Sequence, residues 1–344
     1  MKACIKCGIY FLLLSLLLPA AAPAQTHIFL PANLTRVRAL ALAGAVTSLE
    51  DNLSSISYNP ANFTLYQEPK RFRFTLFLSP LMPGIIANNP EAFLGEPAQG
   101  NDGLVASILS LFKGIDFTLS SLEIGFQFGE PRILDLATYR DKNFLHADDL
   151  YKNHYESVVV RLRLAEQVSV GSSIHLMYFD TDSVGRRWKL ATSYGVAMQP
   201  HRNVRFGVSV FTFPNEIRNY RMLLEQVFDE AINLGISYQT PWDTKIALDV
   251  RNVSVGQKGP REQYFMGIEQ EFFKQIALRG GIQYHTEDGS FTFSTGAGLF
   301  NLNILHGRGG KFRTSNYAIN YALVFKKYGN EKYFVHALNF MVRI

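Results

Sequence analysis

The chain has 344 residues but only two cysteines, Cys4 and Cys7, and both lie at its N-terminus. The rest of the sequence therefore holds no disulfide, no zinc–thiolate site and no cysteine nucleophile. Charged residues make up 18% of the chain, below the roughly 25% that is usual for soluble domains. The formal net charge is only +5. No basic stripe is interleaved with aromatic residues, so we expect no nucleic-acid partner.

The first 24 residues have the layout of a secretory signal peptide. Lys2 and Lys6 precede the apolar run 9–18, and Ala22-Pro23-Ala24 offers a small-x-small cleavage site. An apolar run of about ten residues is too short to cross a bilayer. We therefore expect residues 1–24 to be removed during export, and both cysteines with them.

No second membrane helix is predicted, because the longest uncharged stretches are broken by proline or by polar residues. The chain from Arg71 onward instead has a period of two. In the segment 245–251, Ile246, Leu248 and Val250 alternate with polar or small residues. Successive side chains of a strand point to opposite faces, so such a segment has one apolar face and one polar face. Thirteen segments follow this pattern.

Two features favour a membrane barrel over a secreted β-sandwich, whose strands also alternate. Short connections, such as 165–167 and 199–203, alternate with long ones, such as 129–155 and 214–230, as turns and loops do at the two ends of an outer-membrane barrel. The polar faces are also heavily charged. We expect the following residues of these faces to line the lumen: Arg71, Arg73, Glu123, Arg161, Arg163, Lys189, Arg205, Asp249, Arg251, Glu269, Glu271 and Arg279.

The sequence thus predicts an all-β fold, a transmembrane antiparallel β-barrel over residues 71–344. Bacterial barrels have an even number of strands and both termini at the turn end. This parity requires one more strand between the segments 72–78 and 122–128. Residues 103–112 are the best candidate, although their weak alternation also allows a helix. We therefore expect about fourteen strands. We expect the protein to lie in the outer membrane of a Gram-negative-type envelope.

The segment that precedes the barrel has a different pattern. A small, apolar stretch at 38–49 leads to Glu50-Asp51-Asn52, and Tyr58-Asn59-Pro60-Ala61 follows shortly before the first strand. This order of motifs resembles the start of the FadL/TodX-type outer-membrane transporters of long-chain fatty acids and other hydrophobic molecules. It is similar also to their PorV-like relatives. The resemblance implies a fourteen-strand barrel whose lumen is plugged by the N-terminal segment, here residues 25–70.

The plug motif that this resemblance implies consists of Glu50, Asp51, Tyr58, Asn59, Pro60 and Ala61. Asn59-Pro60 is a turn initiator, because proline fixes φ and the asparagine side chain bonds to nearby backbone groups. A plain loop into the first strand is the simpler alternative. For a plug, we expect the carboxylates of Glu50 and Asp51 to face lumen arginines: Arg71, Arg73, Arg161 or Arg163.

Other constellations carry little chemistry. His146, Asp148, Asp149 and His154 cluster in one loop, but no tight metal-ligand spacing is visible. The glycine-rich run 307–311 lacks the strand-to-helix frame of a phosphate loop. No serine or aspartate partners a histidine in a recognisable catalytic motif. We therefore expect no enzyme activity, no cofactor and no metal.

Two functions of different class remain open for a barrel surrounded by outer-membrane lipid. The first is the passage of a hydrophobic small molecule, such as a long-chain fatty acid, across the outer membrane. The second is a non-enzymatic role, as in the PorV-like branch, in which the barrel is an outer-membrane component that works with secretion-system proteins. A barrel enzyme has the least support in the sequence.

Overall fold

A computed structural model shows the arrangement of the chain. It describes residues 26–29, 34–50, 56–62, 65, 72–88, 90, 99–131, 153–181, 185–211, 231–253, 262–272, 276–286, 289–300, 316–328 and 331–343. The predicted signal peptide, residues 1–24, lies outside the described residues.

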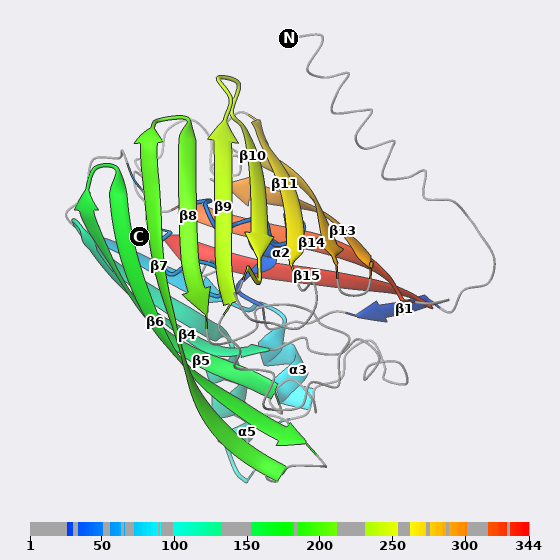
Figure 1. Ribbon diagram of the computed structural model, residues 1–344. Coiled ribbons are helices and arrows are strands. Elements are labelled where there is room, and N and C mark those ends of the chain that lie inside the picture. The colour runs from blue at the N-terminus through cyan, green and yellow to red at the C-terminus, as the bar shows by residue number, and fades with distance from the viewer. Residues whose placement is uncertain are drawn as a thin grey trace, which may run out of the picture.

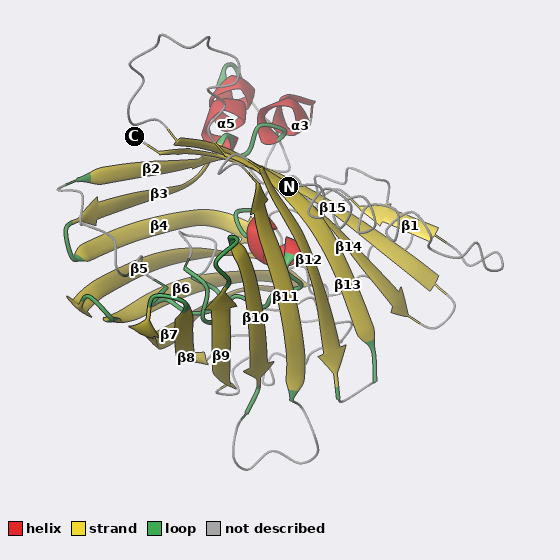
Figure 2. Cartoon of the chain, turned by 90° about the horizontal axis from the view of Figure 1, so that it is seen from above, coloured by secondary structure: helices red, strands yellow, loops and turns green. Residues whose placement is uncertain are grey.

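Fourteen strands, β2 to β15, follow one another around a closed ring (Figures 1 and 2). Each strand of the ring is antiparallel to the next, and β15 closes it by pairing with β2. The predicted all-β barrel and its fourteen strands are confirmed. The strands are β2 Arg73–Leu78, β3 Phe112–Leu119, β4 Leu122–Pro131, β5 Asn153–Ala165, β6 Val168–Thr181, β7 Gly185–His201, β8 Val204–Phe211, β9 Ala231–Gln239, β10 Thr244–Arg251, β11 Gln263–Phe272, β12 Ile276–His285, β13 Phe291–Phe300, β14 Asn316–Tyr328 and β15 Glu331–Arg343.

The two ends of the barrel differ in their connections. The β3–β4, β5–β6 and β7–β8 links are only a few residues long and share one end, where β15 also ends. We call it the turn end, and it is uppermost in Figure 1. The opposite, loop end carries the longer β4–β5 and β8–β9 connections, which span residues 132–152 and 212–230.

A further strand, β1 (Thr26–Phe29), adds to the edge of β15. It runs parallel to β15 and pairs with residues 332–335. The edge is available because β2 is short and pairs only with residues 340–343. Residues 26–29, which the sequence analysis assigned to the plug, therefore lie along the wall and not in the lumen.

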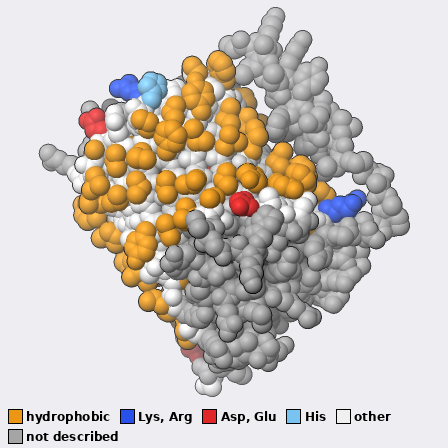
Figure 3. All heavy atoms as spheres, in the orientation of Figure 1, with side chains coloured by type: hydrophobic (Ala, Val, Ile, Leu, Met, Phe, Trp, Pro, Cys, Tyr) orange, Lys and Arg blue, Asp and Glu red, His pale blue; other side chains and the backbone are white. Residues whose placement is uncertain are grey.

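The outer face of the wall is apolar. Figure 3 shows rows of apolar side chains across the visible wall, with charged side chains mainly at its rim. On β7 the outward residues include Trp188 and Met198, which are 56% and 41% exposed, whereas the inward Ala191 and Ser193 are buried. At about 3.3 Å per residue and a tilt of about 40°, the stretch 188–198 covers about 25 Å of barrel height. That height matches the apolar band of an outer-membrane barrel.

Three helices accompany the strands in the described part of the chain. Helix α2 (Val37–Ala41) lies inside the ring, whereas α3 (Met82–Asn88) and α5 (Asp102–Ser110) pack together beside β2 and β3 (Figure 2). Among the described helices, none is long and apolar enough to cross a membrane.

The strand predicted over residues 103–112 is wrong. Most of that stretch belongs to α5, and the strand is β3, which begins at Phe112. The apolar residues Leu104, Val105, Ile108 and Leu109 recur at helical spacing and form one exposed face. The small side chains of the other face, such as Ala106, pack on Met82 and Ile86 of α3.

A lipid-facing position provides a test of the membrane-embedded wall. Val160, at the middle of β5, is 45% exposed on the outer face. We expect Val160→Arg to lower the free energy of unfolding by about 2–4 kcal/mol, and the matched change Leu164→Arg near the turn end by only about 0–1 kcal/mol. Urea unfolding in phospholipid vesicles measures both. Equal losses would show that the wall does not span a bilayer.

Candidate functional site

The lumen is occupied by the N-terminal segment. We call residues 34–50, 56–62 and 65 the plug, and almost all of their side chains are buried. Apolar residues of the plug pack on inward residues of the wall: Leu34 and Val37 join Val324 and Val335, and Ile56 joins Phe77 and Val159. Helix α2 is the only regular element in the described part of the plug (Figure 2). Most backbone groups of the plug therefore have no hydrogen-bond partner within a helix or a strand.

Turns within the plug bond some of these groups, and wall side chains bond others. Among the described residues, a donor from the wall reaches the backbone carbonyl oxygen of seven plug residues. These pairs are Asn339 Nδ2 to Thr35 at 2.5 Å, Ser294 Oγ to Ala41 at 3.1 Å, Arg251 Nη2 to Gly44, Ser237 Oγ to Ser48 at 3.5 Å, Ser209 Oγ to Tyr58 at 2.7 Å, Arg161 Nε to Pro60 at 2.8 Å and Ser169 Oγ to Ala61 at 2.6 Å. Buried carbonyl groups without a partner are costly, so these serines, asparagines and arginines stabilise the plug in one position.

The Asn-Pro motif forms a turn that is fixed on both sides. Asn59 Oδ1 accepts a hydrogen bond from the backbone N–H of Ala61 at 2.9 Å, which closes the turn. Asn59 Nδ2 donates to the carbonyl oxygen of Thr47 in the plug at 2.8 Å and to that of Val196 in the wall at 3.2 Å. The asparagine therefore ties two parts of the plug to strand β7.

Glycines in the wall make room for the plug. A Cβ atom at Gly171 would lie 2.2 Å from the carbonyl oxygen of Pro60, and one at Gly281 would lie 2.3 Å from the carbonyl carbon of Leu42. Real side chains do not approach backbone so closely, so only glycine fits there. One glycine on each of β6 to β9 and β11 to β13 contacts the plug in this way. We call this set the glycine belt: Gly171, Gly195, Gly207, Gly235, Gly267, Gly281 and Gly296.

An ion-pair network joins the plug to strands β10, β11 and β12. The buried carboxylate of Glu269 accepts hydrogen bonds from Arg38 of the plug at 2.9 and 2.8 Å and from Arg279 Nε at 2.6 Å. Lys245 Nζ lies 3.5 Å from the same carboxylate and 2.7 Å from Glu271. One wall carboxylate thus neutralises cations from both the plug and the wall.

A second set of charges lies nearer the loop end. Asp249 Oδ2 accepts the backbone N–H of Thr47 at 2.8 Å and pairs with Arg251 at 3.2 Å. The Arg251 guanidinium also stacks between Tyr58 and Phe265, with its Cζ atom 4.7 and 4.1 Å from the ring centroids. Cation–π contacts of this kind are strongest when they are desolvated.

The start of the plug is held by strand β4. Glu130 accepts hydrogen bonds from the backbone N–H and the hydroxyl of Thr35 at 2.9 and 3.0 Å, and it pairs with Arg36 at 3.5 Å. Burial by itself lowers the pKa of the Arg36 guanidinium. Interaction with Tyr155, Tyr58 and Glu130 outweighs burial and raises that pKa above its ordinary value, so Arg36 stays charged.

The sequence-predicted site residues are placed as follows. Tyr58, Asn59, Pro60, Ala61, Arg161, Arg251 and Glu269 meet in the lumen, in the contacts given above. Arg163 lies at the turn end, where Nη2 donates to the carbonyl oxygen of Ser120 at 3.4 Å. Asp51 and Arg71 lie outside the described residues, as does the side chain of Arg73.

The structure gives Glu50 a partner that was not predicted. Two of the predicted partners, Arg71 and Arg73, have side chains outside the described residues. The Glu50 carboxylate lies 3.9 Å from Arg205 Nη1, whereas Arg161, another predicted partner, bonds to Glu123 on the adjacent strand. Cross-strand pairing explains the difference, because Arg161 and Glu123 are directly opposite each other in the β4–β5 register.

Several contributors were not recognised in the sequence. Glu130 was assigned to a loop, yet β4 extends to Pro131. The glycine belt was also missed, although a signal existed: glycine recurs at lumen-facing positions of strand after strand. Arg38 was part of a small, apolar stretch, and nothing in that stretch indicates Glu269 as its partner.

The lumen changes in polarity along its axis. On β5, β6, β8 and β11, the inward residues nearer the loop end are Tyr155, Met177, Phe211 and Phe265. Those nearer the turn end on the same strands are Arg161, Ser169, Arg205 and Glu269. Other buried residues of the loop half are polar or charged, including Glu130, Asp249, Arg251, Gln263 and Lys326. We call Tyr155, Met177, Phe211 and Phe265 the apolar zone, which lies toward the loops among these polar residues.

The histidine of strand β6 lies in a buried polar cluster of the wall. Within the described ranges, no group of three histidine, cysteine, aspartate or glutamate residues is arranged to hold a metal ion. His175, on β6, is fully buried. Its ring nitrogens lie 2.7 Å from Ser157 Oγ and 2.9 Å from Ser193 Oγ. These contacts link β5, β6 and β7 inside the wall.

Comparison with known proteins gives matches in structure only. No protein-family model matches the chain, and no curated protein is similar to it in sequence. The solved structure of the CymD monoaromatic hydrocarbon channel is 11% identical with a TM-score of 0.45, over 89% of this chain and 94% of that one. A mutant porin of Rhodopseudomonas blastica is 10% identical with a TM-score of 0.34, over 67% and 76% of the two chains. At this level of likeness, conclusions about the site rest on the chain's own side chains.

The glycine belt yields a test of how tightly the plug is seated. We expect Gly281→Ala to lower the free energy of unfolding in detergent by about 1–3 kcal/mol, because the added methyl group overlaps the backbone of Leu42 and Ala43. Gly84→Ala is the matched control, since a methyl group there contacts nothing. Equal effects of the two changes would show that the plug does not press on the wall.

The ion-pair network yields a second test. We expect Glu269→Gln to destabilise the plugged barrel by about 3–5 kcal/mol, because it leaves buried cations without their carboxylate. Glu271→Gln removes a more exposed carboxylate two residues away on the same strand, and we expect a loss of about 0–1 kcal/mol. Urea unfolding at low and high salt measures both. Similar losses would show that Glu269 does not centre the network.

Proposed function

We propose that this protein is an outer-membrane channel that passes hydrophobic small molecules, such as long-chain fatty acids, with the plug as its gate. The observation that supports this most directly is the apolar zone in the loop half of the lumen. Tyr155, Met177 and Phe211 are fully buried in the plugged barrel. A hydrophobic molecule that enters from the loop end and displaces the plug would meet them, and apolar surface favours its desolvation. A hydrophilic solute meets the same surface at a cost.

The plug is consistent with a gate that stays closed at rest. Its backbone is bonded to the wall around much of the ring, so a cargo molecule must displace part of the plug before it can pass. The resemblance of the Tyr58-Asn59-Pro60-Ala61 motif to the FadL/TodX-type transporters supports the same role. A PorV-like role with secretion-system proteins remains the alternative, and no contact in the described lumen favours it.

Uptake by whole cells tests the proposal. In Gram-negative cells that lack their own fatty-acid transporter, we expect this chain to raise the initial rate of labelled oleate uptake several-fold and to leave the rate of maltose uptake unchanged. The readout separates a hydrophobic-molecule channel from a general pore. A stoichiometric protein partner on purification, without oleate uptake, would support the PorV-like alternative.

A pair of matched variants locates the path. Met177 faces the lumen and is fully buried, whereas Met266 faces lipid and is 49% exposed. We expect Met177→Gln to reduce oleate uptake several-fold and Met266→Gln to leave it unchanged at equal amounts of folded barrel. Equal uptake by both variants would contradict a path along the inner wall.

A further inference from the structure

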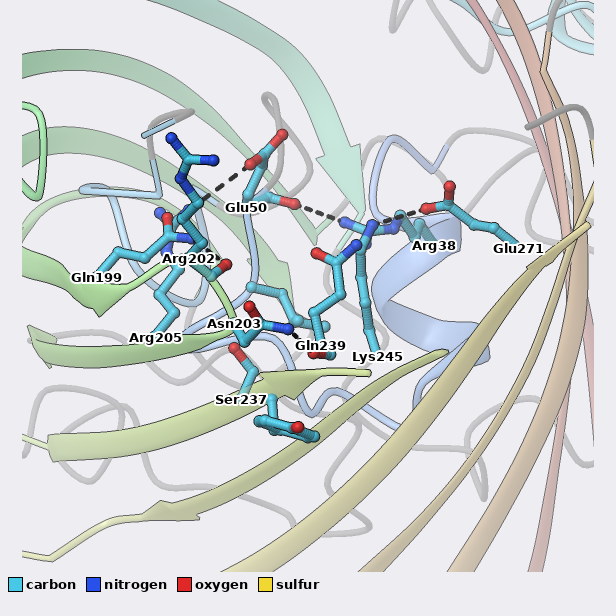
Figure 4. A pocket seen from close by; sticks show the side chains of 12 residues that line it. Arg38, Glu50, Gln199, Arg202, Asn203, Arg205, Ser237, Gln239, Lys245 and Glu271 are labelled. Carbon is cyan, nitrogen blue, oxygen red and sulfur yellow. Dashed lines mark hydrogen bonds and ion pairs between the residues drawn. The ribbon is translucent and has the colours of Figure 1, made fainter. Parts of the chain in front are cut away.

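A polar cavity of about 350 Å³ lies at the turn end, between the plug and the wall. Figure 4 shows its side chains converging from several elements. Arg38 and Glu50 come from the plug, Arg202 and Arg205 from the β7–β8 turn and the start of β8, and Lys245 and Glu271 from β10 and β11. It lies on the charged side of the lumen, away from the apolar zone.

Among the described residues, the lining of this cavity has an excess of positive charge. The charged lining residues comprise four cations, Arg38, Arg202, Arg205 and Lys245, and two carboxylates, Glu50 and Glu271. Glu269 lies behind the lining and bonds to Arg38, but it also bonds to Arg279, a cation outside the cavity. Glu269 and Arg279 have opposite charges, so including both of them leaves the excess of positive charge the same.

Arg205 is the cation of this lining that is most strongly desolvated. It is only 5% exposed, and the charges of Arg161 and Arg38 both repel it. The Glu50 carboxylate attracts it from 3.9 Å, which is longer than a direct hydrogen bond. That carboxylate is 46% exposed, so water weakens the attraction. A bound anion would add a charge-assisted interaction with this guanidinium group.

The cavity is also braced before any ligand arrives. Asn203 Nδ2 donates to the carbonyl oxygen of Gln239 at 2.6 Å, and Gln199 Nε2 donates to that of Arg202 at 2.9 Å. Arg38 Nη1 donates to the carbonyl oxygen of Glu50 at 2.8 Å. These bonds fix the β7–β8 turn and the plug around the cavity, and a preorganised site loses less entropy on binding.

We propose that this cavity is a binding site for an oxyanion, either a carboxylate or a phosphate. Guanidinium groups present paired N–H donors that match two oxygens of such a group, and Arg205 and Arg202 supply them here. Glu50 is the internal carboxylate that the ligand competes with for Arg205. Oxyanion binding at the turn end is independent of which molecule crosses the barrel.

Titration calorimetry of the full mature chain in a non-ionic detergent, at constant ionic strength, tests this site with sodium phosphate as the probe. We expect saturable binding that becomes about tenfold weaker in Arg205→Gln, as for the loss of a charge-assisted hydrogen bond. Arg202→Gln, on the exposed turn, should weaken binding several-fold without affecting the fold. Glu50→Gln should strengthen binding several-fold, because it removes the competing carboxylate.

Lys327→Gln is the matched control, since Lys327 is an exposed cation at the loop end of β14. It should leave phosphate binding unchanged. A second arm uses dihexanoyl phosphatidic acid below its micellar concentration: binding of this lipid alone would identify a head-group site, and binding of both probes a site for soluble oxyanions. Absence of binding by both probes, weaker binding in Glu50→Gln, or an equal loss in Lys327→Gln would overturn the proposal.

Discussion

The structure depends on one constraint: the backbone of the plug must find hydrogen-bond partners inside a barrel whose own strands are already fully engaged with each other. Only the five residues of α2 form a regular element in the described plug. The carbonyl groups of residues such as Gly44, Pro60 and Ala61 therefore turn to wall side chains. An unpaired buried carbonyl costs free energy comparable to a lost hydrogen bond, so this requirement decides which polar residues the wall must present.

The same constraint explains both the glycines and the charges of the inner wall. Side chains can reach the plug backbone only if it comes close, and glycine permits that approach at Gly171 and Gly281. Buried ions such as Arg161 and Glu269 are expensive, but each of them bonds to the plug as well as to an opposite charge. Charge pairs of this kind are better at fixing one arrangement than at adding stability. The apolar zone also contacts the plug, because Tyr155 bonds to Ser57 and Phe265 lies in one buried cluster with Leu42.

Several of these features could be predicted because they depend on neighbours in sequence or on simple parity. The alternation around Ile246, Leu248 and Val250 indicates a strand. Because bacterial barrels have an even number of strands, one more strand is required before residue 122, although the alternation of residues does not show it. The turn at Asn59-Pro60 follows from the side chain's reach to the next residues. The segment 103–112 was wrongly predicted as a strand. Parity required one more strand in this region, and this requirement was given more weight than the helical spacing of Leu104 and Ile108. The pairing of Glu50 with Arg205 was not predicted, because Arg205 is distant in sequence and the strand register decides which arginines are already paired.

The sequence alone thus determined the strands, their two faces and the closed ring, since period two and an apolar outer face are local properties of the chain. Only the tertiary structure decided how the lumen is filled. The glycine belt, the sharing of Glu269 among three cations and the oxyanion cavity each combine residues from the plug with residues from distant strands. Their positions follow from the stagger of the closed ring and from the path of an irregular segment within it. Neither of these is recorded in any local pattern of residues.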